Sequence, residues 1–303
     1  MVNSSKLKTD KEKITLLFMT LPAMLLMLVF TYGPIYGWLY AFFNYRIGMR
    51  LKDCAFVGLK YFKIALSGSD LPGVLVNTLA MSFLAFSIIP LAAIFAILLS
   101  EMRFRRYGKF LQTAATLPNF MSWIIVFAVF SLFFSPGDGV INVALTNANI
   151  IKEPINPLGN VDITWFFQTA IKIWKELGYN SIIFFAAIAG IDTELYDASK
   201  VDGAGRFRTI VNIVVPGLMP TLVTLLLINV GFILNSFDQA YVFYNGLVAP
   251  KINVLDYYVY HVGLQTDDIP FATALSVSKT FVSVILVFSA NFAAKKIRGS
   301  SIV

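Results

Sequence analysis

Residues 194–216, ELYDASKVDGAGRFRTIVNIVVP, form a polar, charged insertion between two long apolar segments. Asp192 or Thr193 can cap a short helix at its start, and the acidic first turn suits the helix dipole. Asp202-Gly203 then ends this helix, since glycine tolerates the positive φ of a sharp turn. The insertion predicts a short helix along a membrane surface, joined by an elbow to a membrane-spanning helix and available to a soluble partner.

The apolar segments on either side indicate an integral membrane protein. The chain has 303 residues, of which 57% are hydrophobic and 14% charged, whereas a soluble domain usually has about 25% charged residues. Membrane orientation explains the net charge of +7 better than nucleic-acid binding, because the basic excess lies in short loops and tails. One cysteine and one histidine exclude a disulfide framework and an HExxH zinc site within the chain.

Six segments are apolar over the roughly 20 residues that a bilayer crossing needs: 14–43, 74–100, 111–134, 165–190, 213–237 and 271–294. The first is longer than the roughly 7–15-residue core of a signal peptide, so we expect it to be retained. The fourth is the weakest, because Lys172, Lys175 and Glu176 interrupt it.

Lysine and arginine predict the orientation. With a cytoplasmic N-terminus, the inner segments hold twice as many of these residues as the outer loops at 44–73, 135–164 and 238–270, which favours cytoplasmic positions for both termini. The outer loops carry Gly, Pro and Asn turn signals. We expect an N-terminal tail, first span and outer loop at 1–72, a five-helix transmembrane domain at 73–294 and a cytoplasmic tail at 295–303.

The insertion resembles the signature of permease subunits of binding-protein-dependent ABC importers, in which Glu-Ala-Ala is followed at fixed spacing by Gly, Ile and Leu-Pro. Here the pattern, with every spacing kept, reads Asp197-Ala198-Ser199, Gly203, Ile213 and Val215-Pro216. Three departures, Asp197, Ser199 and Val215, are conservative in size or charge and bear on the details of ATPase contact.

Further stretches extend the resemblance over roughly residues 14–298. Four short stretches are similar to sequences that recur in sugar-type permeases: FVGL at 56–59, NTL at 77–79, LP at 117–118 and ATA at 272–274. LPNFMSW at 117–123 resembles the branch that handles complex oligosaccharides. The resemblance implies an all-α integral membrane fold of six transmembrane helices, with a cytoplasmic coupling helix between the fourth and fifth.

The resemblance also implies partners and a mechanism. A second homologous permease completes the pathway, an ABC ATPase dimer binds ATP and Mg, and an extracytoplasmic solute-binding protein delivers a sugar. The chain would be a multi-pass protein of the bacterial cytoplasmic membrane, in contact with lipid, with no catalytic residue, metal or cofactor of its own. The residues implied in ATPase coupling are Glu194, Leu195, Asp197, Ala198, Ser199, Asp202, Gly203, Ala204, Ile213 and Pro216. The plainer alternative is that the insertion is only a solvated connector.

Polar and aromatic side chains within the predicted spans are candidates for the substrate pathway, since sugars need hydrogen-bonding groups and aromatic faces. These are Trp123, Gln168, Lys172, Trp174, Lys175, Tyr179, Asn180, Asn229 and Asn235. Asn229 could equally form an interhelical hydrogen bond, and the tryptophans could be interface anchors or packing. The two lysines could pair with Glu176, face outer water, or meet an anionic sugar.

Other functions are less consistent with the sequence. A secondary transporter usually buries several proton-relay residues, and here only Glu176 lies well inside a span, with Asp238 at a margin. A membrane enzyme would need a convergent acid–base or metal constellation, and no GxxxxGKS/T phosphate loop is present. A permease for a non-sugar solute in the same importer class remains the main alternative.

Overall fold

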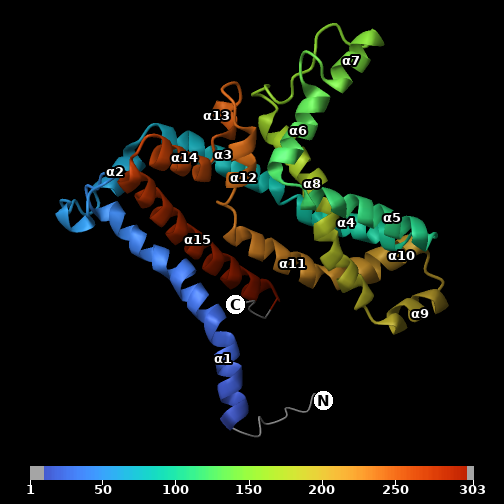
Figure 1. Cartoon of the computed structure of the whole chain (residues 1–303). Coiled ribbons are helices and arrows are strands. Elements are labelled where there is room, and N and C mark those ends of the chain that lie inside the picture. Colours follow the sequence, from blue (N-terminus) through green and yellow to red (C-terminus); the bar gives the residue numbers. More distant parts are fainter. Residues whose placement is uncertain (1–9, 299–303) are drawn as a thin grey trace. The chain divides into compact units, whose positions relative to one another are not determined.

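The computed structural model describes residues 10–298, and the ends of both predicted tails lie outside this range. These residues form helices (Figure 1), with a single isolated bridge between Phe43 and Phe56 in place of any sheet. They divide into two units. Of the described residues, the first unit holds 10–67 and 261–278, and the second holds 68–260 and 279–298.

The first unit is built on a long N-terminal helix. Its elements are α1 (Asp10–Met27), η1 (Leu28–Tyr32), η2 (Gly33–Phe42), η3 (Leu51–Asp53), α2 (Lys60–Ser67), η6 (His261–Gln265) and the start of α15 (Ile269–Arg298). A small core gathers around Ala41, Tyr61 and Ala274. The Tyr61 hydroxyl donates to Asn44 Oδ1 at 2.8 Å, which satisfies the polar end of a largely buried ring.

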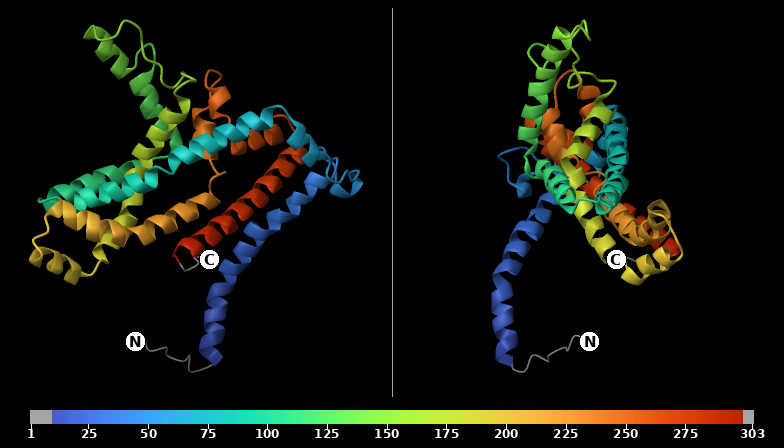
Figure 2. Two further views of the ribbon diagram at one scale, coloured as in Figure 1. Left: turned by 180° about the vertical axis from the view of Figure 1, so that it is seen from behind. Right: turned by 90° about the vertical axis from the view of Figure 1, so that its right-hand side faces the viewer.

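The second unit contains the remaining helices. They are α3 (Asp70–Ala85), α4 (Ile88–Ser100), α5 (Arg105–Thr116), η4 (Leu117–Phe120), α6 (Trp123–Phe134), α7 (Val140–Asn147), α8 (Thr164–Ala189), α9 (Thr193–Val201), α10 (Arg206–Thr209), η5 (Ile210–Val214), α11 (Val215–Gly231), α12 (Phe237–Phe243), α13 (Ala249–Ile252) and α14 (Leu255–Tyr260). Helix α8 runs through the middle of this unit, and α3, α4, α5 and α11 pack against it (Figure 2).

Among the described residues, four helices are long and apolar enough to cross a membrane, or five if one bent pair forms a single span. The bent pair corrects the span expected at 111–134. The chain turns by 106° between Phe120 and Trp123, where the 3₁₀ turn η4 contains Pro118 and the Ser122 hydroxyl caps α6 by accepting from the Ile125 amide. A proline and a new N-cap together end one helix and begin another.

The segment expected at 165–190 forms the continuous helix α8. Because α8 carries three charged residues, it is not among the helices that composition alone identifies as membrane spans.

The boundaries expected at 213–237 are wrong at both ends. A continuous helix begins ten residues before Pro216, at Arg206, and it ends at Gly231. Residues 210–214 form a π-helical turn in which the Val215 amide donates to the Ile210 carbonyl. This wider turn lets the helix pass a proline without breaking, because proline has no N–H to donate.

The segments 44–73, 135–164 and 238–270, expected as loops, contain short helices. These are α2, α7, α12, α13 and α14. Tertiary packing stabilises such short helices: Phe243, Ile252 and Tyr257 are buried in a core cluster with Val126 of α6 and Ile171 of α8.

A second core cluster joins α4, α8 and α11. Ala92, Ala93 and Ala96 give α4 a smooth face, which lets it approach Phe184 of α8 closely. Gly178 permits a still closer approach, because a Cβ there would lie 2.2 Å from the carbonyl carbon and oxygen of Ala115 in α5. These contacts fix α8 against α4 and α5 and so position the polar side chains that α8 carries.

Candidate functional site

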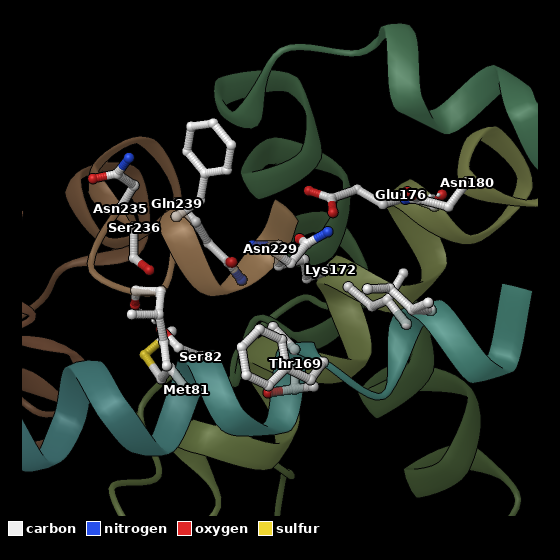
Figure 3. A pocket seen from close by; sticks show the side chains of 16 residues that line it. Met81, Ser82, Thr169, Lys172, Glu176, Asn180, Asn229, Asn235, Ser236 and Gln239 are labelled. Atoms are coloured by element: carbon white, nitrogen blue, oxygen red, sulfur yellow. Dashed lines mark hydrogen bonds between the residues drawn. The ribbon is translucent and has the colours of Figure 1, made fainter. Parts of the chain in front are cut away.

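A polar cavity of about 110 Å³ lies in the second unit between the α3–α4 junction, α8 and the end of α11 (Figure 3). Helix α8 supplies one wall through Thr169, Lys172, Glu176 and Asn180. These residues are spaced by three or four positions, so they share one face of the helix.

The opposite wall is built where helices are interrupted. Helix α11 ends at Gly231, and the connection to α12 contributes Asn235 and Ser236 to the lining. The Ser82 hydroxyl of α3 donates to the Ile233 carbonyl in this connection. Within a membrane, such non-helical backbone is tolerated where it is buried in protein or lines a water-filled cavity.

Four of the predicted pathway residues line this cavity: Lys172, Asn180, Asn229 and Asn235. The Asn229 amide donates to the Leu225 carbonyl of its own helix at 2.9 Å. The hydrogen bond that the structure describes for Asn229 therefore lies within its own helix, and is not the interhelical bond considered for it.

Lys175 and Trp123, also predicted for the pathway, lie together away from the cavity lining. Lys175 is buried, its Nζ donates to the Asn119 carbonyl at 2.8 Å, and it lies 5.4 Å from the centroid of the Trp123 ring. The lysine thus binds a carbonyl at the end of η4, at the sharp turn before α6. This hydrogen bond differs from the pairing with Glu176 considered for Lys175, and its burial removes the lysine from outer water.

The other three predicted residues are also outside the lining. Gln168 is buried and accepts from Gln239 Nε2 at 2.9 Å through its side-chain oxygen. Trp174 packs edge-on against Phe130 with ring centroids 5.6 Å apart, and Tyr179 is half exposed.

Sequence reasoning missed several lining residues. Thr169 and Glu176 extend the polar face of Lys172 and Asn180, and the helical spacing of the four could have revealed them. Ser82, Ser236 and Gln239 carry no such signal, because they come from segments that only the fold brings together.

The cavity offers hydroxyls, amides, one ammonium and one carboxylate within an otherwise apolar bundle. Amides and hydroxyls both donate and accept hydrogen bonds, as a polyhydroxylated ligand requires. The Lys172 ammonium can donate to an anionic group, and the Glu176 carboxylate, which interacts electrostatically with Lys172, can accept from hydroxyls.

The insertion at 194–216 forms the second candidate region. Asp192 is the N-cap of α9, because its Oδ1 accepts from the Glu194 amide at 3.0 Å. At the other end, Gly203 has φ +69°. The Gly203 amide donates to the Lys200 carbonyl at 3.1 Å and the Ala204 amide to the Ser199 carbonyl at 2.9 Å. This bond pattern is a Schellman motif, and it confirms the predicted glycine turn.

Helix α9 has no buried residue, yet it is anchored at one point. Tyr196 packs on the α4–α8–α11 cluster, and burial, followed by the nearby Glu101 carboxylate, raises the pKa of its phenol. Val201 is 88% exposed. The helix therefore presents most of its surface away from the bundle.

A hollow of about 560 Å³ separates α9 from the start of the following helix. Its lining includes six of the predicted coupling residues: Leu195, Ala198, Ser199, Asp202, Ala204 and Ile213. Of the other four, Glu194 belongs to the cap, Gly203 forms the turn, Pro216 lies on α11, and Asp197 is exposed and paired with Lys200 at 2.9 Å.

A family model described as "Binding-protein-dependent transport system inner membrane component" matches residues 88–299. Protein LplB of Bacillus subtilis is 36% identical over 294 residues, covering 96% of this chain and 90% of that protein. The polygalacturonan/rhamnogalacturonan transport system permease protein YteP of the same organism is 35% identical over 93% of this chain and 88% of its own length.

A solved structure is also similar over nearly its whole length. It is a chain of a bacterial alginate ABC transporter in complex with an alginate pentasaccharide-bound periplasmic protein, with a TM-score of 0.86 and 30% identity, covering 96% of this chain and 98% of that chain.

Proposed function

The chain belongs to the family of binding-protein-dependent transport system inner membrane components, and on this premise we propose that it is the permease subunit of an importer for acidic oligosaccharides. It is a transport permease of the cytoplasmic membrane and not a catalytic subunit. It works with a second permease, an ABC ATPase and an extracytoplasmic binding protein.

The similarity to two systems for acidic sugars carries the substrate assignment. The alginate transporter and the polygalacturonan/rhamnogalacturonan permease are both named for polymers that contain uronate sugars. In this chain, Lys172 lines the polar cavity beside Asn180, Asn229 and Asn235. We propose that these side chains form this subunit's half of the substrate pathway, with Lys172 attracting a sugar carboxylate and the asparagines binding hydroxyls.

We further propose the finer architecture that the family implies. Six spans with both termini inside put the long N-terminal helix, α3–α4, the bent pair α5–α6, α8, α11 and α15 across the membrane. ATP and Mg bind to the partner ATPase, and hydrolysis takes place there. The exposed surface of α9, with Asp197, Ala198 and Gly203, docks on that ATPase and transmits its closure to α11, which leads directly to the cavity.

The test uses the complete importer in liposomes, with the binding protein outside and ATP inside. Uptake of an oligouronate should require the ATPase and the binding protein. Lys172→Gln should lower oligouronate uptake roughly tenfold, an effect in the range of one lost charge-assisted contact, and change uptake of a neutral oligosaccharide less.

Lys152→Gln, which removes an exposed lysine outside the cavity lining, is the matched control. If Lys172→Gln and Lys152→Gln gave the same uptake of the oligouronate and the same uptake of the neutral oligosaccharide, Lys172 would have no role in selecting the substrate. Uptake without the ATPase would reject the importer assignment.

A further inference from the structure

A second cavity of about 220 Å³ lies between the α4–α5 turn and α8, away from the polar cavity. Its lining consists of Leu99, Ser100, Met102, Arg105, Gly108, Lys109, Gln112 and Phe185. Arg105, Lys109 and Gln112 are spaced by four and three residues, so they form one polar face of α5. Leu99 and Phe185 supply an apolar side to the same cavity.

Four cations concentrate at this point. Arg103, Arg105, Arg106 and Lys109 are all exposed, and among the side chains that the structure describes no salt bridge joins any of them to a carboxylate. Two of them, Arg105 and Lys109, line the cavity. Because the lining holds two cations and no carboxylate, the cavity is complementary to an anion.

The position of the cavity along the apolar helices indicates which class of anion it meets. The span candidate formed by α3 and α4 ends at Ser100, and the basic residues follow immediately. Phe185 lies one turn before the end of α8. The cavity thus lies at the boundary between the hydrocarbon core and water, where phospholipid headgroups are found.

The outer surface of α5 has the composition of a membrane interface. Phe104, Tyr107 and Phe110 are largely exposed and alternate with the cations. Aromatic rings of this kind favour the headgroup level of a bilayer.

We propose that this cavity binds the headgroup of an anionic phospholipid. Arg105 and Lys109 bind the phosphate, Ser100 and Gln112 bind headgroup hydroxyls, and one acyl chain packs along Leu99 and Phe185. The proposal requires only that the chain lies in a membrane, so it is independent of the substrate. An acidic surface of the ATPase is the competing occupant, but the apolar side of the cavity favours a lipid.

The test measures lipid binding to the complete detergent-solubilised importer. Phosphatidylglycerol or phosphatidylcholine is titrated in, and bound lipid is counted by native mass spectrometry. Arg105→Gln with Lys109→Gln should weaken phosphatidylglycerol binding roughly twenty-five-fold, since each of the two cations that bind the phosphate contributes about a factor of five. Phosphatidylcholine binding should not change.

Arg103→Gln with Arg106→Gln is the matched control, because it removes the same charge from the same segment outside the cavity lining. It should weaken binding less than threefold. The charge-preserving pair Arg105→Lys with Lys109→Arg should retain binding, which separates loss of the site from misfolding.

Several outcomes would overturn the proposal. Equal losses in the two glutamine pairs would indicate diffuse attraction. Competition by inorganic phosphate at equal concentration would indicate a site for free phosphate. Loss of the ATPase with unchanged lipid binding would assign the surface to that partner.

Discussion

Gly178 shows how closely one residue can control the packing of a membrane bundle. A Cβ at this position would lie 2.2 Å from the Ala115 carbonyl and 2.6 Å from the Thr116 amide nitrogen. Because these are backbone atoms, they cannot rotate away. We expect Gly178→Ala to destabilise the subunit by about 1–3 kcal/mol or more, as overpacking does.

Thermal unfolding of the purified importer measures this effect. Gly190→Ala is the control, because the nearest atom to its added Cβ would be 3.5 Å away. Equal melting temperatures for the two variants would contradict the close approach of α8 to α5.

Gly203 tests the elbow after α9 by backbone conformation alone. Nothing lies within 4 Å of a Cβ added there, so the cost of substitution comes only from φ +69°. Gly203→Val should cost about 1–2 kcal/mol in the turn, whereas Gly203→Asn should cost less, because asparagine visits the left-handed region. We expect the valine variant to insert normally, lose co-purifying ATPase and lose substrate-stimulated ATP hydrolysis. Wild-type values for the valine variant would argue against a coupling role.

Asn229 tests the cavity without disturbing contacts between helices. Its side chain bonds only to a carbonyl of its own helix among the hydrogen bonds described for it. We therefore expect Asn229→Leu to change the ranking of oligosaccharides in competitive uptake, with little change in melting temperature. A large loss of stability with an unchanged ranking of oligosaccharides would indicate that Asn229 has a structural role.

At the scale of elements, an ion pair joins three segments of the second unit. Lys279 of α15 pairs with Asp256 of α14, and each side chain is 18% exposed. The other carboxylate oxygen of Asp256 accepts from the Ser236 amide at 3.0 Å, in the connection that lines the cavity. The pair therefore ties the end of α11 to two later helices.

Lys279→Met should leave the Asp256 carboxylate largely buried and unpaired. The expected loss lies between about 1 kcal/mol for an exposed pair and about 3–5 kcal/mol for a buried one. Asp256→Asn combined with Lys279→Met should recover part of it. Thermal unfolding of all four proteins in the cycle measures the coupling, and additive losses would mean that the pair contributes nothing.

The elements also show where sequence reasoning fails. The fifth span was expected to begin at residue 213, but the helix begins at Arg206 and η5 carries it past Pro216. The wider turn depends on which carbonyl the Val215 amide reaches, and sequence periodicity does not encode that choice. Pro118 and Ser122 did signal the break between α5 and α6, but apolar composition alone concealed it.

At the scale of the whole molecule, orientation in the membrane is the property to test. Cys54 is buried and is the only cysteine in the chain, so Cys54→Ser provides a background without native thiols. Val201→Cys and Leu66→Cys replace side chains that are 88% and 83% exposed. In intact cells whose cell wall and any outer membrane have been removed, a membrane-impermeant maleimide should label position 66 directly. It should label position 201 only after the cytoplasmic membrane is permeabilised. The reverse pattern would invert the proposed topology.

The sequence by itself determined the class of protein, the cap and turn of α9 and the family resemblance, because these depend on composition and on residues a few positions apart. Tertiary structure decided which polar residues share a cavity. Lys172 and Lys175 are three positions apart, yet one lines the cavity and the other binds the Asn119 carbonyl. That division follows from how α8 is rotated against its neighbours. The rotation is set by small residues such as Gly178, whose contacts come from distant parts of the chain.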